Sequence, residues 1–205
     1  MADKPHMRAL RDTLLGIAGS TKIAILIDPA AERRNSGARV LSALSLIVRT
    51  NGVDADHLEV SIDQGLVDPK EVRHHADKLR ELGSCEIRCD EDSRIVMGLQ
   101  VADAVAHSVA QVLREELGNF AKKVSLGPES GYDEGIEAPL GWTLRMSLRY
   151  AFFVRPVVVE KGQDPNEVLN AALLNWGVFV SQDLEAGVGN AARRVFGQMW
   201  LGCIH

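Results

Sequence analysis

Two patterns of hydrophobic and polar positions alternate along the first 118 residues. A continuous apolar run predicts a strand at residues 22–28, alternating apolar and polar residues predict a strand at 58–63, and a short strand is expected at 85–89. Segments with apolar residues at three- and four-residue spacing predict helices at residues 7–17, 38–48 and 99–113, and Asp68-Pro69 predicts the start of a polar helix that ends at residue 82. A strand followed by a helix thus recurs three times. This order predicts an α/β fold in which a mostly parallel sheet is flanked by helices.

The same patterns suggest how the chain is divided. Residues 1–118 are expected to form the α/β core. Residues 119–140 are rich in Gly, Pro and polar side chains and are expected to form a loop. Residues 141–205 are expected to form a mainly helical C-terminal extension packed on the core, with helices at 165–176 and 188–200.

Asp103 is the acidic residue of the 99–113 helix that most needs an explanation. The predicted buried stripe of this helix consists of Leu99, Ala102, Ala106, Val109, Ala110 and Leu113. Asp103 falls within this stripe, where a buried carboxylate is costly unless something pairs with it. Gln100 lies on the same side and extends the polar seam. Alternatively, Asp103 lies early in its helix and is favoured by the helix dipole.

Acidic side chains follow each of the predicted strands. Asp28 ends the first and Asp63 the second, while residues 90–92 (Asp-Glu-Asp) follow the third. The carboxyl ends of parallel strands meet at one edge of a sheet, so these acids and Asp103 are expected to converge there. The alternative for each acid is an ordinary role as a helix cap or turn former.

Converging carboxylates without Cys or His at ligand spacing favour Mg²⁺ or Mn²⁺ over zinc. Two such ions about 4 Å apart can activate a water and stabilise the leaving oxygen in phosphodiester cleavage. The chain contains none of GxxxxGK[ST], GxGxxG, GxSxG or HExxH. The chemistries that these motifs mark are therefore not predicted.

Composition narrows the choice of partners. The formal net charge is −5, which excludes an overall basic nucleic-acid binder but leaves a local basic groove open. Arg145 and Arg149 lie beside Trp142, an arrangement that can hold a nucleic-acid strand but also occurs in core helices. No apolar run is long enough to cross a bilayer, and the N-terminus has no signal-like pattern. A cytoplasmic protein without a membrane partner is expected, with its cysteines reduced.

Residues 92–107, DSRIVMGLQVADAVAH, resemble the late motif of a bacterial family known as domain of unknown function 3800, whose members look like ribonuclease H-like proteins. The matching elements are Asp63 at a strand end, Asp92-Ser93, and the run from Gln100 to Asp103. The C-terminal FGQMWLGCIH is also similar to some members. The resemblance covers most of the chain from about residue 20, and it implies a ribonuclease H-like fold.

The chain also departs from the pattern of that family. The resemblance would imply an early strand with Asp-Glu-Ser-Gly and a helix with Glu-x-Lys, and neither is present. Only 21 residues precede the first predicted strand, and Asp28-Pro29-Ala30 is a poor counterpart of the early motif. Either the chain is a truncated or divergent member, or its catalytic centre is incomplete.

The leading hypothesis is a metal-dependent, ribonuclease H-like phosphodiesterase, a nuclease acting on RNA or DNA with Mg²⁺ or Mn²⁺, either intact or degenerate. The expected catalytic residues are Asp63, Asp103 and Asp28; the expected metal ligands are Asp63, Asp103 and Asp92; the expected substrate-binding residues are Gln100, Ser93 and Arg94. A second chain in a homo-oligomer could complete the site. The alternative is a non-catalytic interaction or assembly module of the same fold, which the resemblance places in defence against mobile elements. A weaker third option is a small-ligand binder at the same sheet edge.

Overall fold

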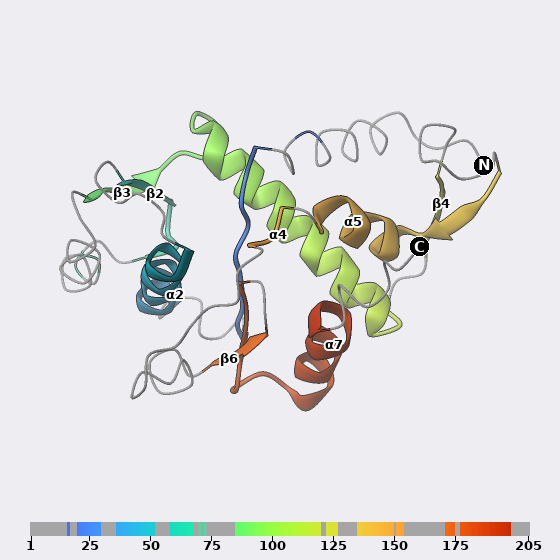
Figure 1. Ribbon diagram of the computed structural model, residues 1–205. Coiled ribbons are helices and arrows are strands. Elements are labelled where there is room, and N and C mark those ends of the chain that lie inside the picture. The colour runs from blue at the N-terminus through green and yellow to red at the C-terminus, as the bar shows by residue number, and fades with distance from the viewer. Residues whose placement is uncertain are drawn as a thin grey trace.

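The computed structural model describes residues 16, 20–29, 36–51, 58–67, 70, 72, 85–119, 122–126, 135–149, 151–153, 171–174 and 177–197. Within them the chain is a mixed α/β protein (Figure 1). The strands are β1 (Ile25–Ile27), β2 (Leu58–Asp63), β3 (Cys85–Glu91), β4 (Lys123–Ser125), β5 (Glu137–Pro139), β6 (Ala171–Leu174) and β7 (Val178–Ser181). The helices are α2 (Ser36–Asn51), α4 (Met97–Glu116), α5 (Leu140–Leu148) and α7 (Ala186–Gly197).

The described strands form three short sheets rather than one. β1 pairs in parallel with β7, which pairs antiparallel with β6. β2 and β3 form a separate parallel pair, and β4 and β5 form an antiparallel pair. The prediction that the strands ending at Asp28 and Asp63 share one sheet edge is therefore wrong. β1 instead pairs with β7, which lies about 150 residues further along the chain, and local hydrophobic patterns do not report such a distant pairing.

Helix α2 lies between the two parallel pairs and packs on both (Figure 1). On one side Leu41 joins a core cluster with Ile62 of β2. On the other side Ala43 and Ile47 pack with Phe179 of β7. Because α2 is apolar on two faces, it links the β2–β3 pair to the β1–β7–β6 sheet.

Helix α4 contacts α5, α7 and β2. Its buried side chains are Val105, Ser108, Val109 and Val112. This face is rotated from the predicted one, because Ala102 and Ala106 are exposed. A valine side chain removes more apolar area from water than an alanine does, so the helix turns its valines inward. Asp103 is exposed as a result, and the prediction that it lies in the buried stripe is wrong.

The C-terminal third contributes strands as well as helices. The predicted helix at 165–176 is wrong over Ala171–Leu174, which is strand β6. Strands β6 and β7 pair antiparallel, and Gly177, directly before β7, has a φ of +80°, which glycine adopts readily. The expected loop at 119–140 contains β4 and β5. The predicted helix at 188–200 corresponds to α7.

The predicted helices at 7–17 and 68–82 lie outside the described residues, apart from Gly16, Lys70 and Val72. Among the described helices, none is both long enough and apolar enough to span a bilayer.

Candidate functional site

The carboxyl ends of β2 and β3 bring two acidic residues side by side. Asp63 is the register partner of Glu91, and both side chains are half-buried. The backbone N–H of Gln64 donates to the carbonyl oxygen of Glu91 at 3.2 Å and fixes the strand ends together. Glu91 was predicted only as part of the acidic loop, but it is the residue that pairs with Asp63.

An irregularity in the pairing of β2 with β3 places Asp63 opposite Glu91. The register shifts between Ser61 and Asp63, so that Ser61 pairs with Arg88 but Asp63 pairs with Glu91. Without the extra residue on β3, Asp63 would face Asp90. Asp90 has a φ of 58°. Among the residues that the structure describes, it is the only non-glycine residue with a positive φ. Bulges of this kind often re-aim a side chain next to a functional site.

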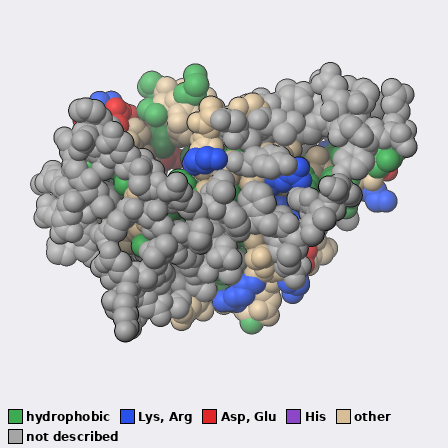
Figure 2. Space-filling model, in the orientation of Figure 1, with side chains coloured by type: hydrophobic (Ala, Val, Ile, Leu, Met, Phe, Trp, Pro, Cys, Tyr) green, Lys and Arg blue, Asp and Glu red, His purple; other side chains and the backbone are tan. Residues whose placement is uncertain are grey.

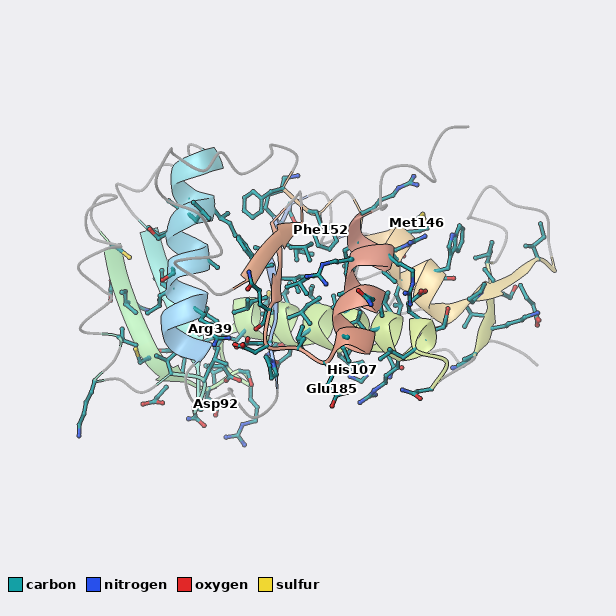
Figure 3. The ribbon with its side chains drawn as sticks, turned by 90° about the horizontal axis from the view of Figure 1, so that it is seen from below. Arg39, Asp92, His107, Met146, Phe152 and Glu185 are labelled. Atoms are coloured by element: carbon teal, nitrogen blue, oxygen red, sulfur yellow. The ribbon has the colours of Figure 1, made fainter. Side chains whose placement is uncertain are left out.

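Asp92 forms a tight turn between β3 and α4 rather than standing free. Its carboxylate accepts from the backbone N–H of Arg94 at 2.9 Å and from Arg94 Nε and Nη2 at 2.9 and 2.7 Å. The pKa of the Asp92 carboxyl is lowered, first by the Arg94 side-chain hydrogen bond and second by the Arg94 backbone N–H. Asp92 is labelled in Figure 3. Any metal at Asp92 must therefore compete with Arg94.

The three expected substrate-binding residues belong to this turn or to the helix after it. Ser93 is half-buried in the turn, whereas the Arg94 side chain is 86% exposed. Gln100 donates from Nε2 to the carbonyl oxygen of Arg94 at 3.1 Å. Gln100 thus holds the turn against the first part of α4. Arg94 bonds to Asp92 through Nε and Nη2, and its Nη1 takes no part in this contact. Nη1 can therefore donate a hydrogen bond to another group.

Asp103 lies on the exposed side of α4, seven residues into the helix. It pays no burial penalty, and it lies beyond the first turn, where the helix dipole acts most strongly. Neither explanation considered from the sequence therefore applies to it. Helix α4 contacts β2, the strand that carries Asp63.

Asp28 belongs to a different cluster, at the end of β1. Arg39 of α2 forms ion pairs with Asp28 at 2.5 Å and with Asp183 at 3.4 Å, and it also contacts Ser181 Oγ at 3.4 Å (Figure 3). The Asp28 and Arg39 side chains are only 11% and 18% exposed. Asp28 therefore ties β1 to α2, and the structure does not bring it together with Asp63. No local signal in the sequence marks Arg39 as the partner of Asp28, or Asp183 as the second partner of Arg39.

The carboxylates at the ends of β2 and β3 meet only the minimal requirement of a metal site. Within the described part of the chain, no group of three or more His, Cys, Asp or Glu residues could hold a metal ion. Mg²⁺ keeps several waters, however, and often uses only one or two protein carboxylates together with substrate phosphates. The half-buried pair of Asp63 and Glu91 fits this smaller requirement.

Two further features of the sequence have structural roles. Arg145 of α5 donates from Nη1 to the carbonyl oxygen of Val195 at 3.3 Å, in the last turn of α7, where helix carbonyls lack internal partners. This contact agrees with the core-helix alternative for the segment around Trp142.

Cys85 and Cys89 pack beside the core cluster of α2, β2 and β3. Burial raises the pKa of the Cys89 thiol, and the charge of Asp90 raises it further.

Comparisons of the chain with family models, with curated proteins and with solved structures find no match.

Proposed function

We propose that the chain is a metal-dependent phosphodiesterase of the ribonuclease H-like type, acting on RNA or DNA at the carboxyl ends of β2 and β3. The observation that carries this proposal is the pairing of Asp63 with Glu91 across the shifted register. Two half-buried carboxylates on adjacent parallel strands are a suitable anchor for Mg²⁺ or Mn²⁺. The resemblance of residues 92–107 to domain of unknown function 3800 supports the same reaction class.

The chain's own residues have distinct tasks in this proposal. Asp63 and Glu91 hold the ion, and Asp103 on the nearby helix α4 supplies an exposed carboxylate at the rim. An ion held there would supply the Lewis acidity that activates a water and stabilises the leaving oxygen. The exposed Arg94 guanidinium positions a substrate phosphate through the nitrogen that Asp92 leaves unused. Asp28 has no catalytic task here, because Arg39 holds it in another sheet.

The test combines metal binding with cleavage. Calorimetry should detect Mn²⁺ binding to the wild-type chain, and Asp63→Asn or Glu91→Gln should abolish it. Glu86→Gln is the matched control, because Glu86 lies on the exposed side of β3 and pairs with Arg88. A labelled RNA or RNA–DNA duplex should be cut with Mn²⁺, preserved with chelator, and preserved by Asp63→Ala. No Mn²⁺ binding at millimolar concentration, together with no cleavage, would refute the proposal.

A second function has its own support: a non-catalytic interaction or assembly module of the same fold. Two of the expected site acids, Asp28 and Asp92, already have arginine partners. Ile95 and Met97, large apolar side chains beside the candidate site, are strongly exposed. Retained partner binding by Asp63→Ala would favour this function if the metal and cleavage tests fail.

A further inference from the structure

The turn between β3 and α4 displays two large apolar side chains to solvent. Ile95 is 81% exposed and Met97 is 76% exposed, whereas the other large exposed apolar side chain of the described residues, Ile136, is 40% exposed. Figure 2 shows hydrophobic side chains gathered above the start of α4, beside charged ones. We define Ile95 and Met97 as the apolar knob. Apolar side chains grouped in this way on an exposed turn often mark a contact surface.

The backbone under the apolar knob is closed by hydrogen bonds. The N–H groups of Ile95 and Val96 donate to the carbonyl oxygen of Asp92 at 2.9 and 3.1 Å. Gln100 fixes the carbonyl of Arg94 from the helix side. The turn is thus ordered before any partner arrives, so that docking on it immobilises little additional chain.

The segment that carries the apolar knob has more acidic than basic residues. Residues 89–103 contain four acids, Asp90, Glu91, Asp92 and Asp103, and one base, Arg94. The one base is already bonded to Asp92. This excess of acids along the segment favours a basic chain over a nucleic acid that carries no divalent ions.

We infer that the apolar knob docks a basic amphipathic segment of another protein, whose apolar side chains cover Ile95 and Met97 while its Lys or Arg side chains meet Asp90 and Asp103. Charge complementarity along an ordered, exposed apolar turn supports a basic partner. This inference rests on the interaction role proposed second above, and it requires neither metal binding nor cleavage. The contact area is small, so binding is weak and depends on salt.

The test uses a fluorescein-labelled synthetic helix of Leu and Lys, with Leu at three- and four-residue spacing, followed by fluorescence anisotropy without divalent ions. The double variant Ile95→Ser/Met97→Ser should lower its affinity about tenfold, equivalent to about 1.4 kcal/mol. Ile136→Ser, which removes an exposed apolar side chain elsewhere, should leave the affinity unchanged. Circular dichroism should show that both variants fold, since all three side chains are exposed.

Asp103→Asn tests the charge part of the inference separately. This substitution should weaken binding of the Leu/Lys helix. It should also make the affinity fall less when the salt concentration rises from about 0.1 to 1 M, over which the screening length falls from about 10 to about 3 Å. A Leu/Glu helix of the same pattern should not bind.

Four results would overturn the inference. The first is that the double variant binds the Leu/Lys helix as tightly as the wild-type chain does, and the second is that the Leu/Glu helix binds as tightly as the Leu/Lys helix. The third is that a metal-free RNA oligonucleotide binds at the apolar knob more tightly than the Leu/Lys helix. The fourth is that the wild-type chain sediments as a dimer and the double variant as a monomer. Measuring Mn²⁺ binding to the same double variant distinguishes a failure of the docking inference from a failure of the phosphodiesterase proposal. Neither Ile95 nor Met97 can ligate a hard cation.

Discussion

At the scale of single residues, Arg94 controls the ionisation of Asp92. Its hydrogen bonds lower the pKa of the Asp92 carboxyl, so the pair favours the folded state above the unfolded pKa, and this contribution is lost as pH falls through the folded pKa. Arg94→Ala should therefore raise the Asp92 pKa toward its ordinary value of about 3.9. A carboxyl-carbon NMR titration measures the change, with Arg88→Ala as the control. An unchanged Asp92 pKa in Arg94→Ala would show that the turn itself sets it.

Glu115 is a second residue whose role is set by one contact. Its Oε2 accepts from the backbone N–H of Gly141 at 2.8 Å, in the first turn of α5, where Pro139 offers no side-chain cap. Glu115→Ala should therefore lower the free energy of unfolding by about 1 kcal/mol, as the loss of an N-cap does. Chemical denaturation measures it, and Glu116→Ala, which removes only a surface pair with Arg194, should change it less.

Gly141 and Glu115 should also be coupled. A Cβ at position 141 would lie 3.0 Å from the Glu115 carboxyl carbon, so Gly141→Ala must displace that side chain. In the Glu115→Ala background the obstacle is gone, and alanine should stabilise the helix by up to about 1 kcal/mol. Equal effects of Gly141→Ala in both backgrounds would contradict this coupling.

At the scale of elements, the bulge in β3 decides which acid faces Asp63. Asp90 holds a positive φ, which a β-branched residue adopts only with strain of about 1–2 kcal/mol. Asp90→Val should lower stability by about that amount and weaken Mn²⁺ binding by moving Glu91 away from Asp63. Asp90→Asn tolerates the same φ and should keep both properties. Urea denaturation and calorimetry on the two variants provide the comparison, and equal stability would mean that the bulge carries no strain.

The observed helices and strands show which sequence patterns were sufficient to predict secondary structure. Strand β2 was predicted with its observed bounds, because Leu58, Val60 and Ile62 alternate with polar residues. Strand β6 lies entirely within the helix predicted at 165–176, because a short apolar run with spacing of three and four fits either structure. The buried face of α4 was misplaced because alanine was counted like valine. The acids at the ends of β2 and β3 were predictable, but the partner of Asp63 depends on a bulge that no local pattern reports.

At the scale of the whole molecule, Arg39 fastens α2 to the ends of β1 and β7. Arg39→Met would leave Asp28 largely buried and unpaired, and should lower the free energy of unfolding by about 3 kcal/mol. Asp28→Asn combined with Arg39→Met should recover much of this loss, because no buried charge remains. Thermal or urea unfolding measures both. Loss of Mn²⁺ binding in Asp28→Asn would return Asp28 to the catalytic set.

The pairing of β1 with β7, and with it the Arg39 cluster, could not be predicted from the sequence. The β1–β7 pairing and the Arg39–Asp183 ion pair join residues more than 140 positions apart, and hydrophobic periodicity carries information only about neighbouring residues. Asp28 and Arg39 are 11 residues apart, but they belong to different elements, which no single helical or strand period connects. The mixed α/β class was predictable, since it follows from the order of local patterns.

The position of α2 between two cores has a consequence for how the protein opens. Leu41 belongs to the core of β2 and β3, and Ile47, less than two turns further on, packs against Phe179 of β7. Melting this helix would expose apolar surface on both sides at once, so neither half can open at a low free energy while the other stays closed. Amide hydrogen exchange of Val60 and Val180 should therefore converge on one opening free energy, and the chain should unfold in a single cooperative step.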